Sequence, residues 1–156
     1  MAIISREQIV EGLVKILGEE QVITDEQVLK DSSIDRYRKY EQVCEVYTQP
    51  IPAAVVYVKT PEQVSEVLTF ANDNEINVVP RTGHSAIEGG LETALKDSVV
   101  IDGSMMNKVL KVDEYNMQVT CQCGVPLQDL DDMLRERGLT TGHSPQSNHL
   151  HRSVDW

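Results

Sequence analysis

The sequence predicts an α+β fold, in which short strands and helices follow one another without a regular repeat. Residues 53–80 contain a β-branched run, an amphipathic stretch and a second apolar run. A third apolar run at 98–102 precedes two closely spaced strand patterns at 108–113 and 116–122. An amphipathic helical stretch follows them, and this mixture of elements is typical of α+β domains.

Residues 1–50 are predicted to form a helical N-terminal lead. Ser5-Arg-Glu-Gln8 has the spacing of a capping box. Apolar residues then recur at helical spacing, at Ile9, Leu13, Ile16 and Leu17. A second short helix is expected at 25–30, whereas residues 31–40 are polar and give no clear pattern. Gln49-Pro50-Ile51-Pro52 favours an extended chain, which ends the lead.

A strand–helix–strand unit is predicted in residues 53–80. The run Ala53-Ala-Val-Val-Tyr-Val-Lys59 has the length and composition of a strand. Thr60-Pro61-Glu62-Gln63 is a strong helix start, with Thr60 as the N-cap and proline at the first helical position. Ile76–Pro80 is the second strand. The two strands of such a unit should be parallel and joined by a right-handed connection.

Three further strands and a helix are predicted after residue 97. Ser98-Val-Val-Ile-Asp102 is a short strand, and the patterns at 108–113 and 116–122 form a hairpin because so few residues separate them. Gly124-Val-Pro126 opens a helix. Its apolar stripe consists of Leu127, Leu130, Met133 and Leu134. Gly138 is placed to end this helix.

The composition excludes several classes of function. With 25 acidic and 14 basic residues the net charge is −11, which argues against nucleic acid or an anionic membrane surface as the main partner. No apolar run approaches the roughly 20 residues that cross a bilayer, and the first residues lack a signal-peptide core. We therefore expect a cytoplasmic protein with a solvated acidic surface.

Three cysteines, Cys44, Cys121 and Cys123, form no disulfide framework. We expect them to be reduced and to pack as small apolar residues. If residues 116–123 form one strand, Cys121 and Cys123 point to the same face.

The most informative segment runs from Val78 to Leu91. A short apolar run enters a loop of small and glycine residues that includes Gly83, Gly89 and Gly90. Such loops let backbone N–H groups approach a phosphate, because few Cβ atoms stand in the way. The loop does not have the G-x-G-x-x-G pattern of dinucleotide-binding folds. Taken alone, it fits a structural turn as well as a phosphate site.

Three segments in this order resemble one family of flavoproteins. They are the loop at 80–91, Asp102-Gly-Ser-Met-Met-Asn107 and Thr141-Gly-His-Ser-Pro-Gln-Ser147. Together they resemble the PCMH-type FAD-binding domain of the vanillyl-alcohol oxidase superfamily, in the branch of alkyl-dihydroxyacetone-phosphate synthase, glycolate oxidase and D-lactate dehydrogenase. The resemblance implies a small βαβ subdomain behind the helical lead and the start of a second subdomain. The FAD-binding domain would occupy residues 51–147 and be incomplete.

The resemblance also implies which residues would contact FAD. In this family a loop of the same kind wraps the pyrophosphate of FAD with backbone N–H groups and a hydroxyl, and the third segment approaches the flavin. The cofactor-binding residues expected on this basis are Arg81, Thr82, Gly83, His84, Ser85, Ala86, Ile87, Gln146 and Ser147. The segment 102–113 is expected to be structural, with Met106 and Leu110 packed and Asn107 turning the chain.

Two residues of the loop depart from the family pattern. Thr82 and His84 stand where glycines are common, and each adds a Cβ to a loop that favours permissive backbone angles. This puts the tightness of phosphate binding in doubt. Some branches attach FAD covalently through a loop histidine, but His84 is one position away from that histidine, so we expect noncovalent binding.

The resemblance stops at Ser147, and residues 148–156 form a divergent tail. Family members continue with a hydrophobic stretch, a Gly-Gly pair, the rest of the FAD domain and a cap domain. Arg152-Ser-Val-Asp-Trp156 followed by a stop is what a one-base shift makes of codons for a family-like Gln-Ile-Gly-Gly-Leu-Val. We therefore expect a frameshifted, truncated chain without catalytic residues, and inactive by itself.

The resemblance thus predicts the FAD-binding N-terminal portion of a flavin-dependent oxidoreductase acting on a hydroxy acid or related substrate. That small-molecule substrate would be bound only in an intact relative, and homo-oligomer formation is open. One alternative is a non-catalytic fold remnant or interaction module that binds no flavin. A second is a metal-binding module that uses His143, His149 and His151, but these lie near the chain end rather than on defined elements.

Overall fold

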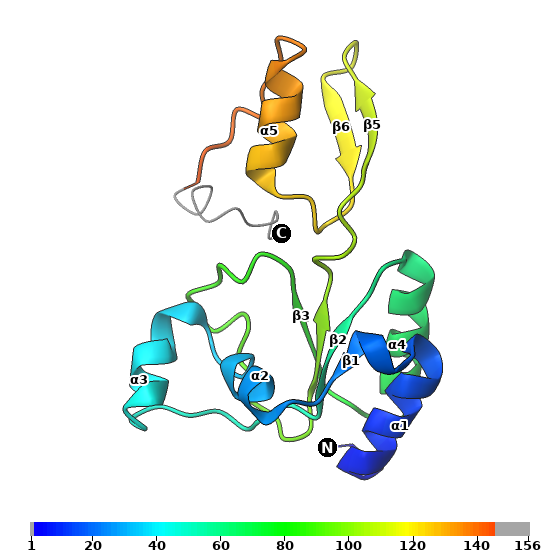
Figure 1. Ribbon diagram of the computed structural model, residues 1–156, viewed down its shortest axis with the longest axis vertical. Coiled ribbons are helices and arrows are strands. Elements are labelled where there is room, and N and C mark those ends of the chain that lie inside the picture. The colour runs from blue at the N-terminus through cyan, green and yellow to red at the C-terminus, as the bar shows by residue number, and fades with distance from the viewer. Residues whose placement is uncertain (1, 146–156) are drawn as a thin grey trace.

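The computed structural model describes residues 2–145, which form two units stacked along the long axis of the molecule (Figure 1). The larger unit is a four-stranded sheet with helices on both faces, and the smaller unit is a hairpin with one helix. The elements in chain order are α1 (Arg6–Leu17), η1 (Glu19–Gln21), β1 (Val22–Ile23), α2 (Glu26–Asp31), η2 (Arg36–Arg38), α3 (Lys39–Val43), β2 (Ala54–Tyr57), α4 (Pro61–Asp73), β3 (Val78–Arg81), β4 (Val99–Asp102), β5 (Val109–Asp113), β6 (Gln118–Cys121) and α5 (Leu127–Arg135).

The strand order of the larger sheet is β1-β2-β4-β3. β2 and β3 each pair in parallel with β4, so they run parallel to one another as predicted, with β4 between them. β1 pairs antiparallel with β2 and was not predicted, because a strand of two residues leaves no periodic pattern.

The predicted helix starts are confirmed. Ser5 forms a capping box with Gln8, whose backbone N–H donates to the Ser5 hydroxyl while its side chain accepts from the Ser5 N–H. Thr60 caps α4 by accepting from the N–H of Gln63, and Pro61 is the first helical residue. These caps are local in sequence, which is why the residue pattern predicts them well.

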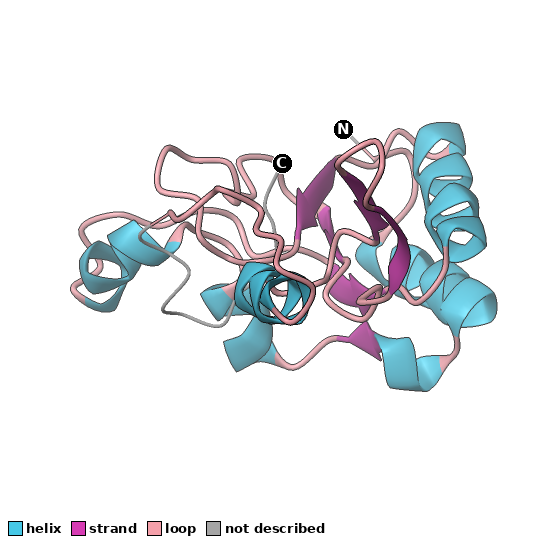
Figure 2. Cartoon of the chain, turned by 90° about the horizontal axis from the view of Figure 1, so that it is seen from above, coloured by secondary structure: helices cyan, strands magenta, loops and turns pink. Residues whose placement is uncertain are grey.

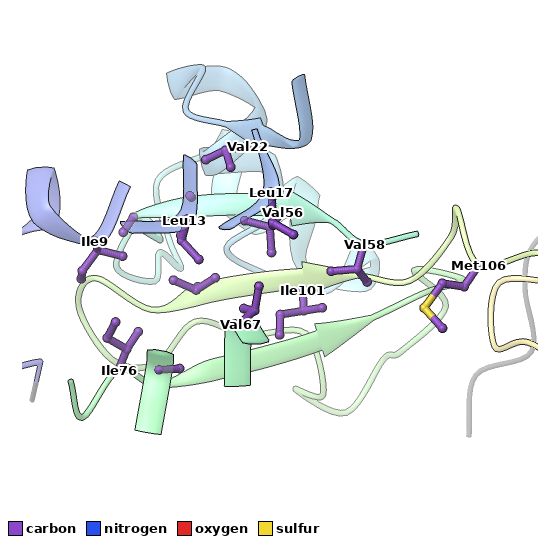
Figure 3. Packing of buried hydrophobic residues seen from close by; sticks show 14 residues of the cluster. Ile9, Leu13, Leu17, Val22, Val56, Val58, Val67, Ile76, Ile101 and Met106 are labelled. Atoms are coloured by element: carbon purple, nitrogen blue, oxygen red, sulfur yellow. The ribbon is translucent and has the colours of Figure 1, made fainter. Parts of the chain in front are cut away.

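Helices α1 and α4 cover one face of the sheet (Figure 3). Ile9 and Leu13 of α1 and Val67 of α4 are fully or almost fully buried against strand residues such as Val56 and Ile101. Burial of this apolar surface is the main stabilising contribution to the larger unit.

Helix α2 covers the opposite face, so the strands lie between helices on either side (Figure 2). Leu29 packs there against Val55, Val79 and Val100, one from each parallel strand. Because side chains alternate along a strand, Arg81 and Asp102 lie on this same face, two residues beyond Val79 and Val100. Both charged side chains therefore lie on the face of the sheet that α2 covers.

The smaller unit contains the predicted hairpin, β5 and β6, with α5 packed against it through Val125, Leu130 and Leu134. Met106 is buried as expected, but Leu110 is 61% exposed, and its predicted packing role is wrong. The β5–β6 register shifts between Val109 and Lys111, which takes Leu110 out of the regular alternation.

The cysteines behave differently from one another. All three are free thiols, and Cys121 packs against the hairpin core as expected. Cys44 and Cys123 are exposed, so their predicted packing role is wrong. Cys44 follows the end of α3, and β6 ends at Cys121, which leaves Cys123 outside the strand.

Within residues 2–145, no helix is both long enough and apolar enough to span a membrane.

Candidate functional site

The glycine-containing loop leaves the sheet at the carboxyl ends of its parallel strands. Arg81 is the last residue of β3, Asp102 is the last residue of β4, and the two are paired in register. The carboxyl ends of parallel strands meet at one edge, which is where open α/β sheets usually bind their ligands. The loop is therefore at a position suited to a ligand site.

A buried ion pair forms the base of this site. Arg81 Nε donates to Asp102 Oδ2 at 2.8 Å, and Arg81 Nη1 donates to the hydroxyl of Ser32 at 2.6 Å. The side chains of Arg81 and Asp102 are only 7% and 1% exposed. Because Ser32 follows α2, this cluster joins the helical lead to the start of the loop.

The carboxylate of Asp102 accepts further hydrogen bonds. His84 Nε2 lies 3.0 Å from Oδ2, and the N–H of Ser104 donates to Oδ1 at 2.9 Å. Burial alone would raise the pKa of Asp102, but the hydrogen bonds from His84, Ser104 and Arg81 outweigh it and lower the pKa from 3.8 to about 2. Asp102 is thus a carboxylate throughout the physiological pH range.

His84 occupies a backbone conformation that favours glycine. Its φ is +55°, in the left-handed region, where an L-residue is less stable than glycine by about 1–2 kcal/mol. Histidine in place of the family's glycine at this position therefore strains the backbone of the loop. The hydrogen bond between the imidazole and Asp102 offsets part of that strain.

The far end of the loop is held by Asp35, a residue that no sequence pattern indicates. Asp35 is fully buried, and its Oδ2 and Oδ1 accept from the N–H groups of Gly89 at 2.5 Å and Leu91 at 2.9 Å. Asp35 lies in the polar stretch 31–40, 54 residues before Gly89, and no local pattern signals such a distant contact.

The middle of the loop offers backbone donors. Among residues 2–145, the N–H groups of Ala86, Ile87 and Glu88 have no acceptor. Of these three residues, Ala86 lines a mainly apolar hollow of about 600 Å³. Thr82, Ala86 and Gly90 line it from the loop, and Gly103 and Cys123 line it from the connection to the smaller unit. A volume of this size is within the range of small-molecule and cofactor pockets.

A second, smaller hollow of about 220 Å³ lies where the helical lead meets the loop. It is lined by Arg36, Lys39, Arg81 and His84, and also by Asp31. Lys39 and Arg81 are paired with Asp31 and Asp102, so the lining is polar and its charges are largely balanced.

The expected cofactor-binding residues fall into two groups. Arg81, Thr82, Gly83, His84, Ser85, Ala86 and Ile87 lie together in the loop. Gln146 and Ser147 lie outside the described residues.

The segment after α5 is anchored by Asp131, which accepts from Thr140 Oγ1 at 2.8 Å and from the N–H of Thr141 at 2.9 Å. The Thr141 and Thr140 hydrogen bonds, with that of Arg135, lower the pKa of Asp131.

The metal-binding alternative receives no support from the part of the chain that the structure describes. No three His, Cys, Asp or Glu side chains in residues 2–145 are placed to hold a metal ion. His143 is exposed, and His149 and His151 lie outside the described residues.

Small residues let two segments approach one another closely beside the larger hollow. A Cβ on Gly103 would stand 2.8 Å from Cys123 Sγ and 3.1 Å from Thr82 Cγ2, so glycine is what lets this connection approach the start of the loop. Small residues, an apolar hollow and N–H groups that have no acceptor among residues 2–145 together suit a ligand that carries a phosphate.

Most of the chain is similar in sequence to known proteins. Residues 52–150 match the family model described as FAD binding domain. The FAD-linked oxidoreductase YgcU of Escherichia coli (strain K12) is 58% identical over 147 residues, which are 94% of this chain and 30% of YgcU. The mitochondrial D-lactate dehydrogenase (cytochrome) 1 of Saccharomyces cerevisiae is 38% identical over 96 residues, which are 60% of this chain and 16% of that enzyme.

The fold also matches a solved structure of alkyldihydroxyacetonephosphate synthase. The TM-score is 0.81 at 25% identity, over 94% of this chain and 28% of the synthase chain. This match confirms the predicted α+β fold of the PCMH-type FAD-binding domain. The chain thus spans 30% or less of the length of each of these relatives.

Proposed function

Because the chain belongs to the FAD binding domain family, we propose that it binds FAD with the loop Arg81–Ile87 around the pyrophosphate. The observation that carries this proposal is that, among the described residues, the N–H groups of Ala86, Ile87 and Glu88 have no acceptor, and that Ala86 lines the 600 Å³ hollow. Backbone N–H groups in such a loop hold phosphate oxygens without a bulky side chain between them.

The roles of the individual residues follow from where they lie. Arg81 directs Nε and Nη1 to Asp102 and Ser32, so its main role is to hold the loop at the sheet edge. In this proposal the backbone of residues 82–87 contacts the pyrophosphate. Gln146 and Ser147 lie outside the described residues, and only the family resemblance assigns them to the flavin end. His84 keeps its imidazole on Asp102, and FAD is bound noncovalently.

The reaction belongs to the longer protein of which such a domain is a part. The yeast relative is named as a D-lactate dehydrogenase, which supports a hydroxy acid or a related compound as the substrate. Bound flavin would supply the chemistry by accepting two electrons from the substrate. This chain contributes cofactor binding, and the substrate contacts lie in the remainder of such relatives, of which the chain spans 30% or less.

A titration with FAD tests the proposal. Purified wild-type chain should shift the visible absorbance of added FAD and change its fluorescence at a stoichiometry of one per chain. Ala86→Trp should abolish this binding because the indole fills the hollow. Ala94→Trp is the matched control, since Ala94 is exposed in the same connection between β3 and β4. Failure of the wild-type chain to bind FAD would favour a fold remnant or interaction module instead.

A further inference from the structure

The helical lead contacts the glycine-containing loop at both of its ends. At the first end, Ser32 accepts from Arg81. At the second end, the N–H of Thr93 donates to the carbonyl of Ser33 at 3.0 Å, and Arg38 Nε lies 3.3 Å from Glu92 Oε1. The segment 32–38 therefore ties down both ends of the loop, although it lies outside the residues that match the family model.

Asp35 is the central residue of this segment. It is fully buried, and each of its carboxylate oxygens accepts one backbone N–H, from Gly89 and from Leu91. Gly89 has a φ of +88°, so the chain turns there in a conformation that glycine adopts without strain. The two hydrogen bonds fix this turn directly after residues 86–88, whose N–H groups have no acceptor in the described part of the chain.

We propose that Asp35 is a positioning residue that orders the phosphate-binding loop before the cofactor arrives. This inference rests on the proposed FAD binding. Ordering a loop costs conformational entropy. If the loop is already ordered in the free protein, less conformational entropy is lost when the cofactor binds. Hydrogen bonds to a buried carboxylate are among the stronger ones in proteins, so two of them can hold a short glycine turn.

Asp35→Asn is the direct test. The amide has one accepting oxygen, and its NH₂ group only donates, so one of the two N–H groups loses its acceptor. We expect the amide hydrogens of Gly89 and Leu91, which donate to Asp35, to exchange faster and the Kd for FAD to rise about tenfold or more. Asp113→Asn is the matched control, because Asp113 accepts from the N–H of Asn116 in the distant β5–β6 hairpin. It should leave the Kd unchanged.

Arg38→Gln provides a second variant that leaves the buried carboxylate in place. The Arg38 side chain is 41% exposed, so its loss should not prevent folding. It removes the ion pair with Glu92 at the same end of the loop and should raise the Kd about two- to fivefold. Arg137→Gln is its control, since Arg137 pairs at 3.7 Å with Glu114 in the smaller unit.

The outcomes separate the two proposals. If wild-type chain binds no FAD, the proposed function fails, and the role of Asp35 in cofactor binding fails with it. If wild-type chain binds FAD and Asp35→Asn binds equally well, FAD binding stands and the positioning role is overturned. If Asp35→Asn does not fold, hydrogen exchange of the wild-type chain decides: the amide hydrogens of Gly89 and Leu91 should exchange slowly before FAD is added, and fast exchange there overturns the inference.

Discussion

Arg81 and Asp102 end two neighbouring parallel strands, and their side chains meet with Nε 2.8 Å from Oδ2 in the interior of the protein. The pair anchors the start of the loop at the sheet edge. A buried ion pair is costly to desolvate, but once it is formed, removal of one partner leaves an uncompensated charge. This asymmetry makes the pair sensitive to substitution.

Asp102→Asn should therefore destabilise the protein by about 3 kcal/mol or more, because the guanidinium of Arg81 stays buried without its counterion. Urea unfolding followed by circular dichroism measures the free energy of unfolding. Asp31→Asn is the control, since Asp31 and Lys39 form an exposed pair at 3.7 Å, and its effect should stay below about 1 kcal/mol. Similar small effects of both substitutions would contradict the anchoring role of Asp102.

The pH dependence of stability should report the same carboxylate. The pKa of Asp102 in the folded protein is about 2, below its ordinary value of 3.8. The ionised side chain therefore contributes stability in full above 3.8, and the contribution is lost as the pH falls through about 2. The shift corresponds to about 2 kcal/mol. The difference in unfolding free energy between wild type and Asp102→Asn, measured in a pH series, should shrink over this acidic range. A constant difference would show that the charge is not involved.

The residue patterns predict those parts of the fold whose causes are local. The caps at Ser5 and Thr60 and the hairpin after residue 108 depend on neighbours a few residues away. The position of β4 between β2 and β3 depends instead on how the sheet packs, which no single segment specifies. Leu110 is exposed for a similar reason, since the irregular register of β5 and β6 decides its direction.

The sequence also predicts only the local part of the candidate site. The loop 81–87 carries a family pattern and was identified from the sequence. Asp35 was not, because its two hydrogen bonds join a polar segment to a turn 54 residues later. Nor does the pattern reveal that Arg81 uses its guanidinium on Asp102 and Ser32, since that depends on strand register and on where α2 ends.

The strain at His84 should be visible in a pair of substitutions. Both His84→Ala and His84→Gly lose the imidazole, but only alanine keeps a Cβ at a φ of +55°. His84→Gly should therefore be more stable than His84→Ala by about 1 kcal/mol in urea unfolding. At the exposed His143, which has no positive φ, glycine should be the less stable of the two by up to about 1 kcal/mol. The same order at both positions would show that His84 is unstrained.

Noncovalent FAD binding predicts that denaturation releases the flavin. His84 Nε2 lies 3.0 Å from a buried carboxylate, which holds the imidazole on the sheet edge. After reconstitution with FAD and precipitation with acid, the flavin absorbance should appear in the supernatant. Flavin that stays with the precipitate in wild type, but not in His84→Ala, would instead identify a covalent bond to this histidine.

Gly124 lies close to the connection between the two units. Its N–H donates to the carbonyl of Met106 at 2.8 Å, and a Cβ there would lie 2.7 Å from the carbonyl oxygen of Ser104. Backbone atoms cannot rotate away, so the connection must shift, and Gly124→Ala should cost about 1–3 kcal/mol in urea unfolding. Gly90→Ala is the control. A Cβ there would meet only Ala86 Cβ at 3.4 Å, and its φ is not positive, so the change should stay within about 1 kcal/mol. Equal effects of the two substitutions would mean that the close approach at Gly124 does not limit how the units pack.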